Sequence, residues 1–416
     1  MARSAMVEAA AQLTQALGLL AGLPPGPDRD RKEIDLQIAL GASLIATKGW
    51  AVPEVGTTYR RARELCTSDD QVPQLLATLA GLFQHYLHWS SKLVALRIAK
   101  ELLRLAEQTQ DRSAQAVGHR AMGVGMLFNG QLLPAMTHFE RSLALYDPAN
   151  RASPVYFVGA ENRVGCLLFI ALIMLFCGYP DQALVRSREA LAAAYELDHA
   201  FTTSQTLYLT CWLHQIRRER RVVEERSGAL KGLTGEHGLS AWAAHGAVLH
   251  GWAIGEGGAA DTGIAELQHG LAASDAMGIQ QHTPCFLGLL AALYLKIENT
   301  SEALKVLDEA LARVDRLEER WFEADLRRLK GEALLALAPE RAAEAEAWYQ
   351  QALVIAREQG ARLWELRAAT SLARLWRDQG RRAEARDLLA PVYGWFTEGF
   401  DTRDLKDAKA LLDELA

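Results

Sequence analysis

The 416-residue sequence contains little proline and few runs of β-branched residues. Twelve prolines are present, while alanine, leucine, glutamate, arginine and glutamine are abundant. These five residue types lose little rotamer freedom in a helix, whereas proline interrupts one. The composition therefore argues against a sheet-rich chain and predicts an all-α fold.

Cysteine is also scarce, and its arrangement argues against cross-links. The five cysteines form an odd number, and none are spaced as CxxC. They are Cys66, Cys166, Cys177, Cys211 and Cys285. Because their neighbours are mostly apolar, we expect reduced core thiols in a cytoplasmic protein and no disulfide framework.

Long apolar runs are absent as well. The longest, Cys166 to Cys177, would span only about 18 Å as a helix, whereas a bilayer core is about 30 Å thick. The N-terminal stretch MARSAMVEAAAQLTQAL lacks the continuous apolar segment of a secretory signal. We therefore expect no membrane association, and we interpret the apolar run as a helix buried on most sides.

Neither sign of charge forms a block. The formal net charge is −6, from 45 basic and 51 acidic residues that alternate along the chain. Such a surface provides no field that attracts nucleic acid or anionic lipid. We expect a protein or peptide partner, or a small effector, and no nucleic acid.

What the sequence does contain is an internal repeat. With half of its 416 residues apolar, the chain also has more core-forming material than one ordinary domain contains. Segments such as SEALKVLDEALA and AEARDLLAPVY share a small residue followed by larger ones at helical spacing. The aligned small positions are Ala9, Val55, Ala95, Ala135, Ala183, Val223, Gly263, Ala303, Ala345 and Ala385. Six of the nine successive spacings equal 40.

A second column of small residues lies twelve positions before most of these anchors. It includes Gly123, Ala171, Cys211, Gly251, Ala291 and Ala373. Small residues at matched places indicate that two helices cross closely. Turn signals such as FNGQ and IENT separate the two columns. Each unit is therefore predicted to be an antiparallel helix pair.

These units resemble tetratricopeptide-like repeats. The stretches LLAALYLKIENTSEALKVLDEAL (289–311) and LARLWRDQGRRAEARDLL (372–389) match the family pattern well, while the unit around Gly263 is degenerate. The resemblance implies an α-α superhelix of about ten helix pairs. The period of about 40 exceeds the 34 residues of the commonest form, so longer helices are expected.

Three stretches point to a more specific group of repeat proteins. They are LQIALGASLIATKGWAVPEV, GYPDQALVRSREAL and the tail LAPVYGWFTEGFDTRDLKDAKALLDEL. These look like the C-terminal helical region of bacterial signalling proteins that carry a class III nucleotide cyclase and an AAA or STAND ATPase. The likeness implies a regulatory or sensor region of such a system. The chain has no GxxxxGK(S/T) phosphate loop and no paired-aspartate cyclase site, so we expect neither catalysis nor a cofactor.

The two ends of the chain are expected to differ from the repeats. Residues 1–390 are predicted to form the repeat array and residues 391–416 a C-terminal cap, because the last unit of a stack needs its apolar side covered. In this cap Asp404 is expected to cap the N-terminus of a final helix. A ligand site in the tail is the alternative. The first unit supplies only a second helix, so we expect residue 1 to lie within a longer array, or the chain to be a fragment.

Three short motifs have a structural and a functional interpretation. His85 and His88 share one helix face as metal ligands would, but no further ligand follows at a suitable interval, so a satisfied helix histidine is preferred. The arginines of the RRERR run (217–221) could bind a phosphate or an acidic peptide, but a solvated turn is expected there. The stretch GEGGAAD from Gly255 lacks the lysine of a phosphate loop and is interpreted as a turn.

One pattern favours a binding groove. Trp212 and Trp252 are 40 residues apart and therefore occupy equivalent places on first helices, which line the concave face of tetratricopeptide repeats. Tyr208 and Gln215 lie about one turn either side of Trp212, and His245 lies two turns before Trp252. We predict that these five residues form a ligand or peptide groove. Packing between long helices is the alternative explanation.

Two classes of function remain. The first is a non-catalytic scaffold that binds a protein, peptide or effector. The second is an enzyme whose site is assembled in the groove from distant histidine and carboxylate side chains. The absence of GxSxG, HExxH, a metal-ligand cluster or a phosphate loop favours the first.

Overall fold

The computed structural model describes residues 2–147 and 161–416. These residues contain twenty α-helices and no β-strand, which confirms the all-α prediction. The α-helices are α1 (Ala2–Ala21), α2 (Pro27–Lys48), α3 (Pro53–Leu65), α4 (Val72–Trp89), α5 (Lys92–Gln108), α6 (Arg112–Phe128), α7 (Leu132–Leu145), α8 (Asn162–Phe176), α9 (Pro180–Glu196), α10 (Ala200–Ile216), α11 (Arg220–His237), α12 (Ser240–Glu256), α13 (Ala260–Ala276), α14 (Thr283–Lys296), α15 (Thr300–Leu317), α16 (Glu323–Leu337), α17 (Ala342–Gln359), α18 (Arg362–Asp378), α19 (Arg382–Gly394) and α20 (Arg403–Leu415).

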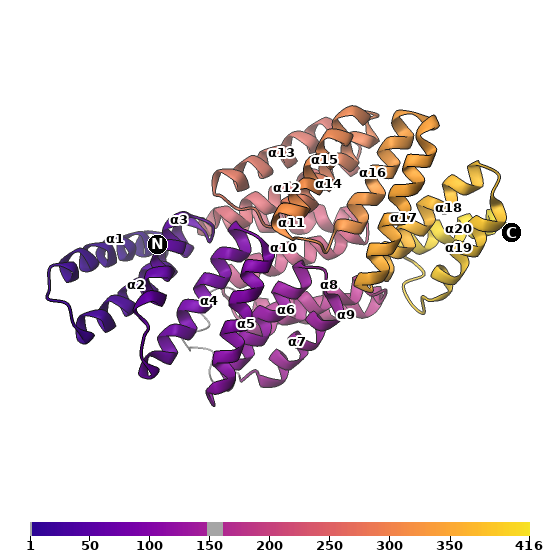
Figure 1. The fold of residues 1–416 in the computed structure, drawn as a ribbon. Coiled ribbons are helices and arrows are strands. Elements are labelled where there is room, and N and C mark those ends of the chain that lie inside the picture. The colour runs from indigo at the N-terminus through magenta and orange to yellow at the C-terminus, as the bar shows by residue number, and fades with distance from the viewer. Residues whose placement is uncertain (1, 148–160) are drawn as a thin grey trace.

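The helices stack in chain order. Each one from α2 to α19 packs against both the helix before it and the helix after it. Figure 1 shows an elongated array with the N-terminus at its indigo end and the C-terminus at its yellow end. The predicted superhelix of helix pairs is confirmed.

The repeat anchors all lie on odd-numbered helices. They run from Ala9 on α1 to Ala385 on α19, and all are buried except Ala9, which is half-buried. Helices α2 to α19 therefore form consecutive pairs in which the even-numbered helix comes first. This arrangement fits the proposed repeat array of residues 1–390.

Even-numbered helices form the inside of the superhelix and odd-numbered helices the outside. In α10, 14 of 17 residues are buried, whereas in α11 only 4 of 18 are. The four buried residues of α11 recur at intervals of three or four, as in a helix with one apolar stripe. A helix that is buried on nearly every side must instead have neighbours all around it.

Those neighbours come from a later turn of the superhelix. The carbonyl of His88 accepts a hydrogen bond from the Gln280 amide (2.7 Å), and that of Phe128 accepts one from the Arg320 amide (2.7 Å). Contacts of this kind join residues at least 151 positions apart in the sequence, as between Arg367 and Ile216, and as many as 218, as between Gly399 and Asp181. In Figure 1 the purple helices α4–α8 accordingly lie beside the pink and orange helices α10–α16. The chain thus returns on itself, and the inner faces of two turns meet.

A buried ion pair lies at the centre of this contact. Lys92 at the start of α5 and Glu319 before α16 are fully buried, with an N···O distance of 3.1 Å. Lys92 also donates to the carbonyl of Leu87 (2.8 Å). The Glu319 carboxylate accepts from the His282 amide (3.0 Å) and from Trp321 Nε1 (3.1 Å). We call this set the interturn clasp, because it joins three linkers that are distant in the sequence.

The degenerate unit around Gly263 has a simple packing explanation. A Cβ atom at Gly263 would lie 2.5 Å from the carbonyl oxygen of Gly251, and one at Gly251 would lie 2.6 Å from that of Gly263. Real Cβ atoms do not approach this closely, so α12 and α13 cross with their backbones in contact. The usual alanine is replaced because the crossing leaves no room for a side chain.

The tail covers the end of the array and also reaches back along it. Helix α20 packs on α18 and α19 through Leu405, Ala408, Leu411 and Leu415, which are buried. Before α20, the Glu398 carboxylate accepts hydrogen bonds from the first amides of α9, those of Asp181 and Gln182 (2.8 and 3.1 Å). The expected N-cap role of Asp404 is wrong. Thr402 occupies that position, and Asp404 is buried in an ion pair with Arg367 (2.9 Å).

Deleting residues 391–416 is expected to lower the melting temperature and to promote aggregation. The deletion exposes apolar surface on α18 and α19, and each buried leucine contributes about 1.5–3 kcal/mol. Phe400→Ala is the matched control, since Phe400 is 49% exposed and its loss should change little. Thermal melts followed by circular dichroism measure both. An unchanged melting temperature in the truncated chain would contradict the covering role.

Lys92→Met is expected to lower the free energy of unfolding by about 3–5 kcal/mol, because it leaves the Glu319 charge buried without a cation. Adding Glu319→Gln should restore part of the loss, since the neutral amide oxygen still accepts from His282 and Trp321. Urea denaturation measures each variant.

The exposed pair Lys48–Glu54 provides the control for that experiment. Both side chains are about half exposed, so Lys48→Met should cost no more than about 1 kcal/mol. If the double variant loses as much free energy of unfolding as the sum of the two single variants, Lys92 and Glu319 do not act as a pair.

Candidate functional site

The closed interior leaves one sizeable cavity among the described residues. It lies between α4, α5, α6, α8, α10 and α12 and is bounded by the linker before α14. The enclosed space is about 60 Å³, and the whole recess, including the part open to solvent, is about 750 Å³. Since about 10–15 Å³ of such space holds one water molecule, the enclosed part has room for several waters or one inserted side chain.

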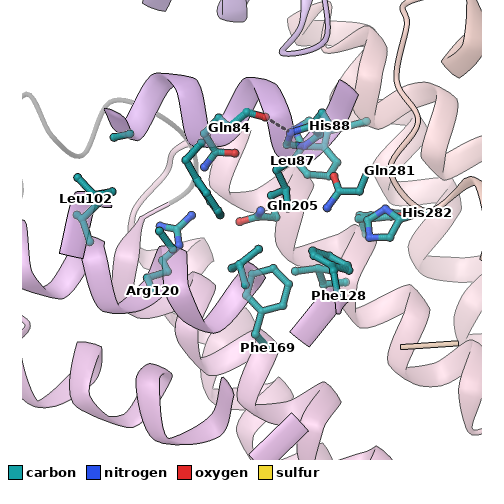
Figure 2. A pocket seen from close by; sticks show the side chains of 18 residues that line it. Gln84, Leu87, His88, Leu102, Arg120, Phe128, Phe169, Gln205, Gln281 and His282 are labelled. Atoms are coloured by element: carbon teal, nitrogen blue, oxygen red, sulfur yellow. Dashed lines mark hydrogen bonds between the residues drawn. The ribbon is translucent and has the colours of Figure 1, made fainter. Parts of the chain in front are cut away.

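Amide and aromatic side chains dominate the wall of this cavity. Phe83, Phe128, Phe169, Tyr208 and Trp242 supply aromatic surface. The polar groups are Gln84, His88, Arg120, Gln205, Gln281 and His282. Figure 2 shows the polar ends of Gln84, Arg120 and Gln205 turned toward the same space. None of the described lining residues carries a carboxylate, so the wall as described is neutral to positive.

Three buried polar atoms of the wall have no hydrogen-bond partner among the described residues: Gln205 Oε1, Trp242 Nε1 and His282 Nε2. The side-chain oxygen of Gln205 is buried and accepts no hydrogen bond within residues 2–147 and 161–416. Such an atom costs about 1–3 kcal/mol unless a water or ligand supplies a donor. Burial also lowers the pKa of Arg120, which lines the cavity from α6.

Two buried histidines, His88 and His282, line the other end of the cavity, and a third, His245, packs against His282 with ring centroids 5.7 Å apart. His88 stacks on Trp50 with ring centroids 4.3 Å apart, and its Nδ1 lies 2.8 Å from the Gln84 carbonyl. Nδ1 of His282 lies 2.8 Å from the Tyr208 hydroxyl. Burial lowers the pKa of His88 and His245 to about 3 and that of His282 well below its ordinary value. All three are therefore neutral at physiological pH.

The five residues predicted to form a groove are all buried. Tyr208 and Trp212 are fully buried, and Gln215, His245 and Trp252 are 7%, 1% and 5% exposed. Trp212 stacks on Phe286 with centroids 5.7 Å apart and packs against Trp321. Only Tyr208 lines the cavity. The groove expected at the surface is thus closed at these positions, which favours the packing explanation, and their contact with a ligand stays a prediction.

Most residues of the cavity wall could not be predicted from the sequence. Gln84, Gln205 and Gln281 belong to no motif, and they meet because the fold brings α4, α10 and a linker together. Trp242 lies on the same helix as Trp252, but at a position that the 40-residue register did not single out. A search for tryptophans on the inner helices would have found it.

The three short motifs have clear positions in the structure. His85 Nδ1 lies 2.9 Å from the Trp50 carbonyl, so His85 and His88 are both satisfied helix histidines. The turn predicted from Gly255 lies between α12 and α13. The solvated turn expected at RRERR is wrong for its first two residues: Arg217 is buried against the Pro180 carbonyl (3.0 Å), and Arg218 is about one-third exposed and faces α20.

No group of three histidine, cysteine, aspartate or glutamate side chains among the described residues is placed to hold a metal ion. No helix of this part of the chain is long and apolar enough to cross a membrane.

The fold is similar to those of known helical repeat proteins. No family model matches the chain. An uncharacterized protein of Rhizobium meliloti (strain 1021) is 24% identical over 380 residues, which is 90% of this chain and 36% of that protein, so the chain spans about a third of the relative's length. Among solved structures, a Rap protein complexed with competence and sporulation factor has a TM-score of 0.61 to this chain at 10% identity. The match covers 92% of this chain and the whole of the Rap chain. The human IFIT1 dimer covers 99% of this chain, and 85% of it is matched, with a TM-score of 0.51 at 15% identity. These likenesses confirm a tetratricopeptide-like solenoid.

The neutral, buried state of His245 makes stability depend on pH. Its folded pKa lies below that of the unfolded chain, so between about pH 6.5 and pH 3 the folded state binds fewer protons and loses stability as the pH falls. His245→Phe should remove this contribution, and its ring nitrogens have no described partner to lose. Between pH 7.5 and pH 5 the parent chain should lose about 2 kcal/mol more than the variant.

Urea midpoints at the two pH values measure this difference. The control is His269→Gln on the outer helix α13, where the side chain is exposed and the substitution should leave the pH dependence unchanged. Equal pH dependence in the parent and in His245→Phe would show that His245 is protonated in the folded chain.

Proposed function

We propose that the chain is a non-catalytic scaffold that binds a short peptide, or an extended segment of a protein, in the interior cavity. The observation that carries the proposal is the buried, unpartnered oxygen of Gln205 beside the side chains of Gln84 and Arg120. A peptide backbone presents both N–H and C=O groups, and glutamine amides match both. The aromatic wall suits one apolar side chain of such a ligand.

The size of the cavity supports this choice of ligand. A cavity of about 60 Å³ has room for one side chain of such a ligand, and it opens to solvent. The fold is compatible with such a role, since the similar Rap protein is complexed with competence and sporulation factor. Catalysis by a histidine and a carboxylate is not favoured, because no described carboxylate lines the cavity.

The wider setting is proposed from the sequence resemblance. The tail and the first repeats are similar to the helical region of bacterial signalling proteins with an ATPase or a nucleotide cyclase. We propose that this chain is the regulatory or sensor region of such a system in the cytoplasm. Binding in the cavity would then be transmitted through the interturn clasp, which adjoins it at His282.

A displayed library of random heptapeptides, selected on the intact chain, tests the binding role. Selected peptides should bind with measurable affinity by calorimetry, and Gln84→Leu with Gln205→Leu should weaken them at least about tenfold, as expected for the loss of two hydrogen bonds. Gln350→Leu on the outer face of α17 is the matched control. Circular dichroism checks that all variants are folded. If the selected peptides bind the double variant and the parent chain with equal affinity, the peptide site is not the interior cavity.

A further inference from the structure

A second recess lies near the C-terminal end of the superhelix. It is formed by the turn after α10 together with α16, α18 and α20, and its volume is about 30 Å³. Its lining includes four arginines, which we call the arginine cluster (Arg218, Arg328, Arg367 and Arg374), and three carboxylates (Glu332, Asp404 and Asp407). This recess shares no lining residue with the interior cavity, so it is a separate candidate site.

Two arginines of the cluster are fully engaged by carboxylates. Arg367 binds Asp404 with two nitrogens, at 3.0 and 2.9 Å, and also donates to the Ile216 carbonyl. Arg328 donates to Asp325 (2.6 Å) and to Glu332 (2.5 Å). These are short, charge-assisted contacts. Both arginines are structural and neutralise the buried acids around them.

The other two arginines are not engaged in this way. Arg218 reaches Asp404 and Asp407 only at 3.4 Å, whereas charge-assisted N–H···O contacts are usually about 2.7–2.9 Å. Arg374 is exposed and makes no hydrogen bond or ion pair with any described residue. Two guanidinium groups thus border the same recess with donors to spare.

The backbone at Arg218 gives an independent reason to look for a role of its side chain. Its φ is +60°, in the left-handed region that favours glycine. The turns after α6, α8, α12 and α18 have glycine at the corresponding left-handed place, and the turn after α14 has a glutamate. The turns with this left-handed residue are at Gly130, Gly178, Gly258, Glu298 and Gly380. Most of the equivalent turns have glycine at this place, so the arginine is a reason to examine what its side chain contacts.

We propose that Arg218 and Arg374 bind an oxyanion group of phosphate size in this recess. The donors come from the two guanidinium groups, because the neighbouring hydroxyls are already used: Ser371 donates to Glu332 (3.0 Å) and Thr370 to the Leu366 carbonyl (2.7 Å). A volume of about 30 Å³ leaves room for a small anion.

The surrounding charges explain why an anion is favoured there. Arg367 and Arg328 repel the Arg218 charge, and this repulsion adds to burial in lowering the pKa of Arg218, while Asp404 opposes both. Asp404 is occupied by Arg367 and Glu332 by Arg328. Asp407 is more exposed and only loosely held by Arg218. A bound oxyanion would replace this loose contact and offset the repulsion.

Inorganic phosphate is the first probe, added to the intact chain at constant ionic strength balanced with chloride. Phosphate should raise the melting temperature in a saturable way that chloride does not reproduce. Arg218→Gly introduces the residue that the turn favours, and Arg374→Gln removes an exposed side chain without a partner, so both should remain folded. Each should weaken phosphate binding at least about tenfold. Arg97→Gln, an exposed arginine on α5, is the control and should retain the full effect.

A phosphoserine peptide and its unphosphorylated counterpart then distinguish the source of the oxyanion. Tighter binding of the phosphopeptide than of inorganic phosphate would indicate a phosphorylated partner, and binding of phosphate alone a free anion; both support the site. A rise in melting temperature that is equal in Arg218→Gly, Arg374→Gln and the parent chain would overturn it. So would the lack of any rise beyond that given by chloride. Neither result depends on whether the interior cavity binds a peptide.

Discussion

The buried ion pair between Lys92 and Glu319 is the contact on which the closed form of this superhelix depends. A charge without a counterion in such a place would be strongly destabilising, so the linkers that carry the two residues must stay together. Glu319 also fixes the backbone at His282 and the indole of Trp321. Through these bonds the first turn of the superhelix is held against the second.

Because the two turns of the superhelix pack together, the inner face of the array is buried and is not an open binding surface. An open solenoid presents its concave face to solvent, whereas here the even-numbered helices of two turns pack together and bury most of that face. Trp212, Phe286 and Trp321 become core residues for this reason. The interior cavity and the recess near the C-terminus remain, and each is bordered by polar groups that the described part of the chain leaves partly unpartnered.

These recesses differ in chemistry because different helices form them. The interior cavity is lined by amides and aromatic rings, which suits a ligand that offers both backbone hydrogen bonds and an apolar group. The recess near the C-terminus is lined by four arginines, two of them committed to buried acids. The C-terminal tail contributes both to the second recess and to the packing between turns. Asp404 on α20 binds Arg367 in the recess, and the Glu398 carboxylate accepts a hydrogen bond from the first turn of α9.

The repeat register and the all-α fold were predictable from the sequence, because a residue's place on a helix and a close crossing of two helices depend on neighbours three to twelve positions away. Anchors such as Ala303 and Ala385 show this directly. The burial of Trp212, the ion pair of Asp404 and the position of Arg218 were not predictable. They depend on contacts between segments that are 37 to 189 residues apart in the sequence, such as Arg367 with Asp404 and Arg218 with Asp407, and a local pattern contains no information on so distant a contact. The sequence alone thus determined the helices and their pairing, whereas the tertiary structure decided that the groove closes and where its polar recesses remain, since closure is a contact between turns of the superhelix.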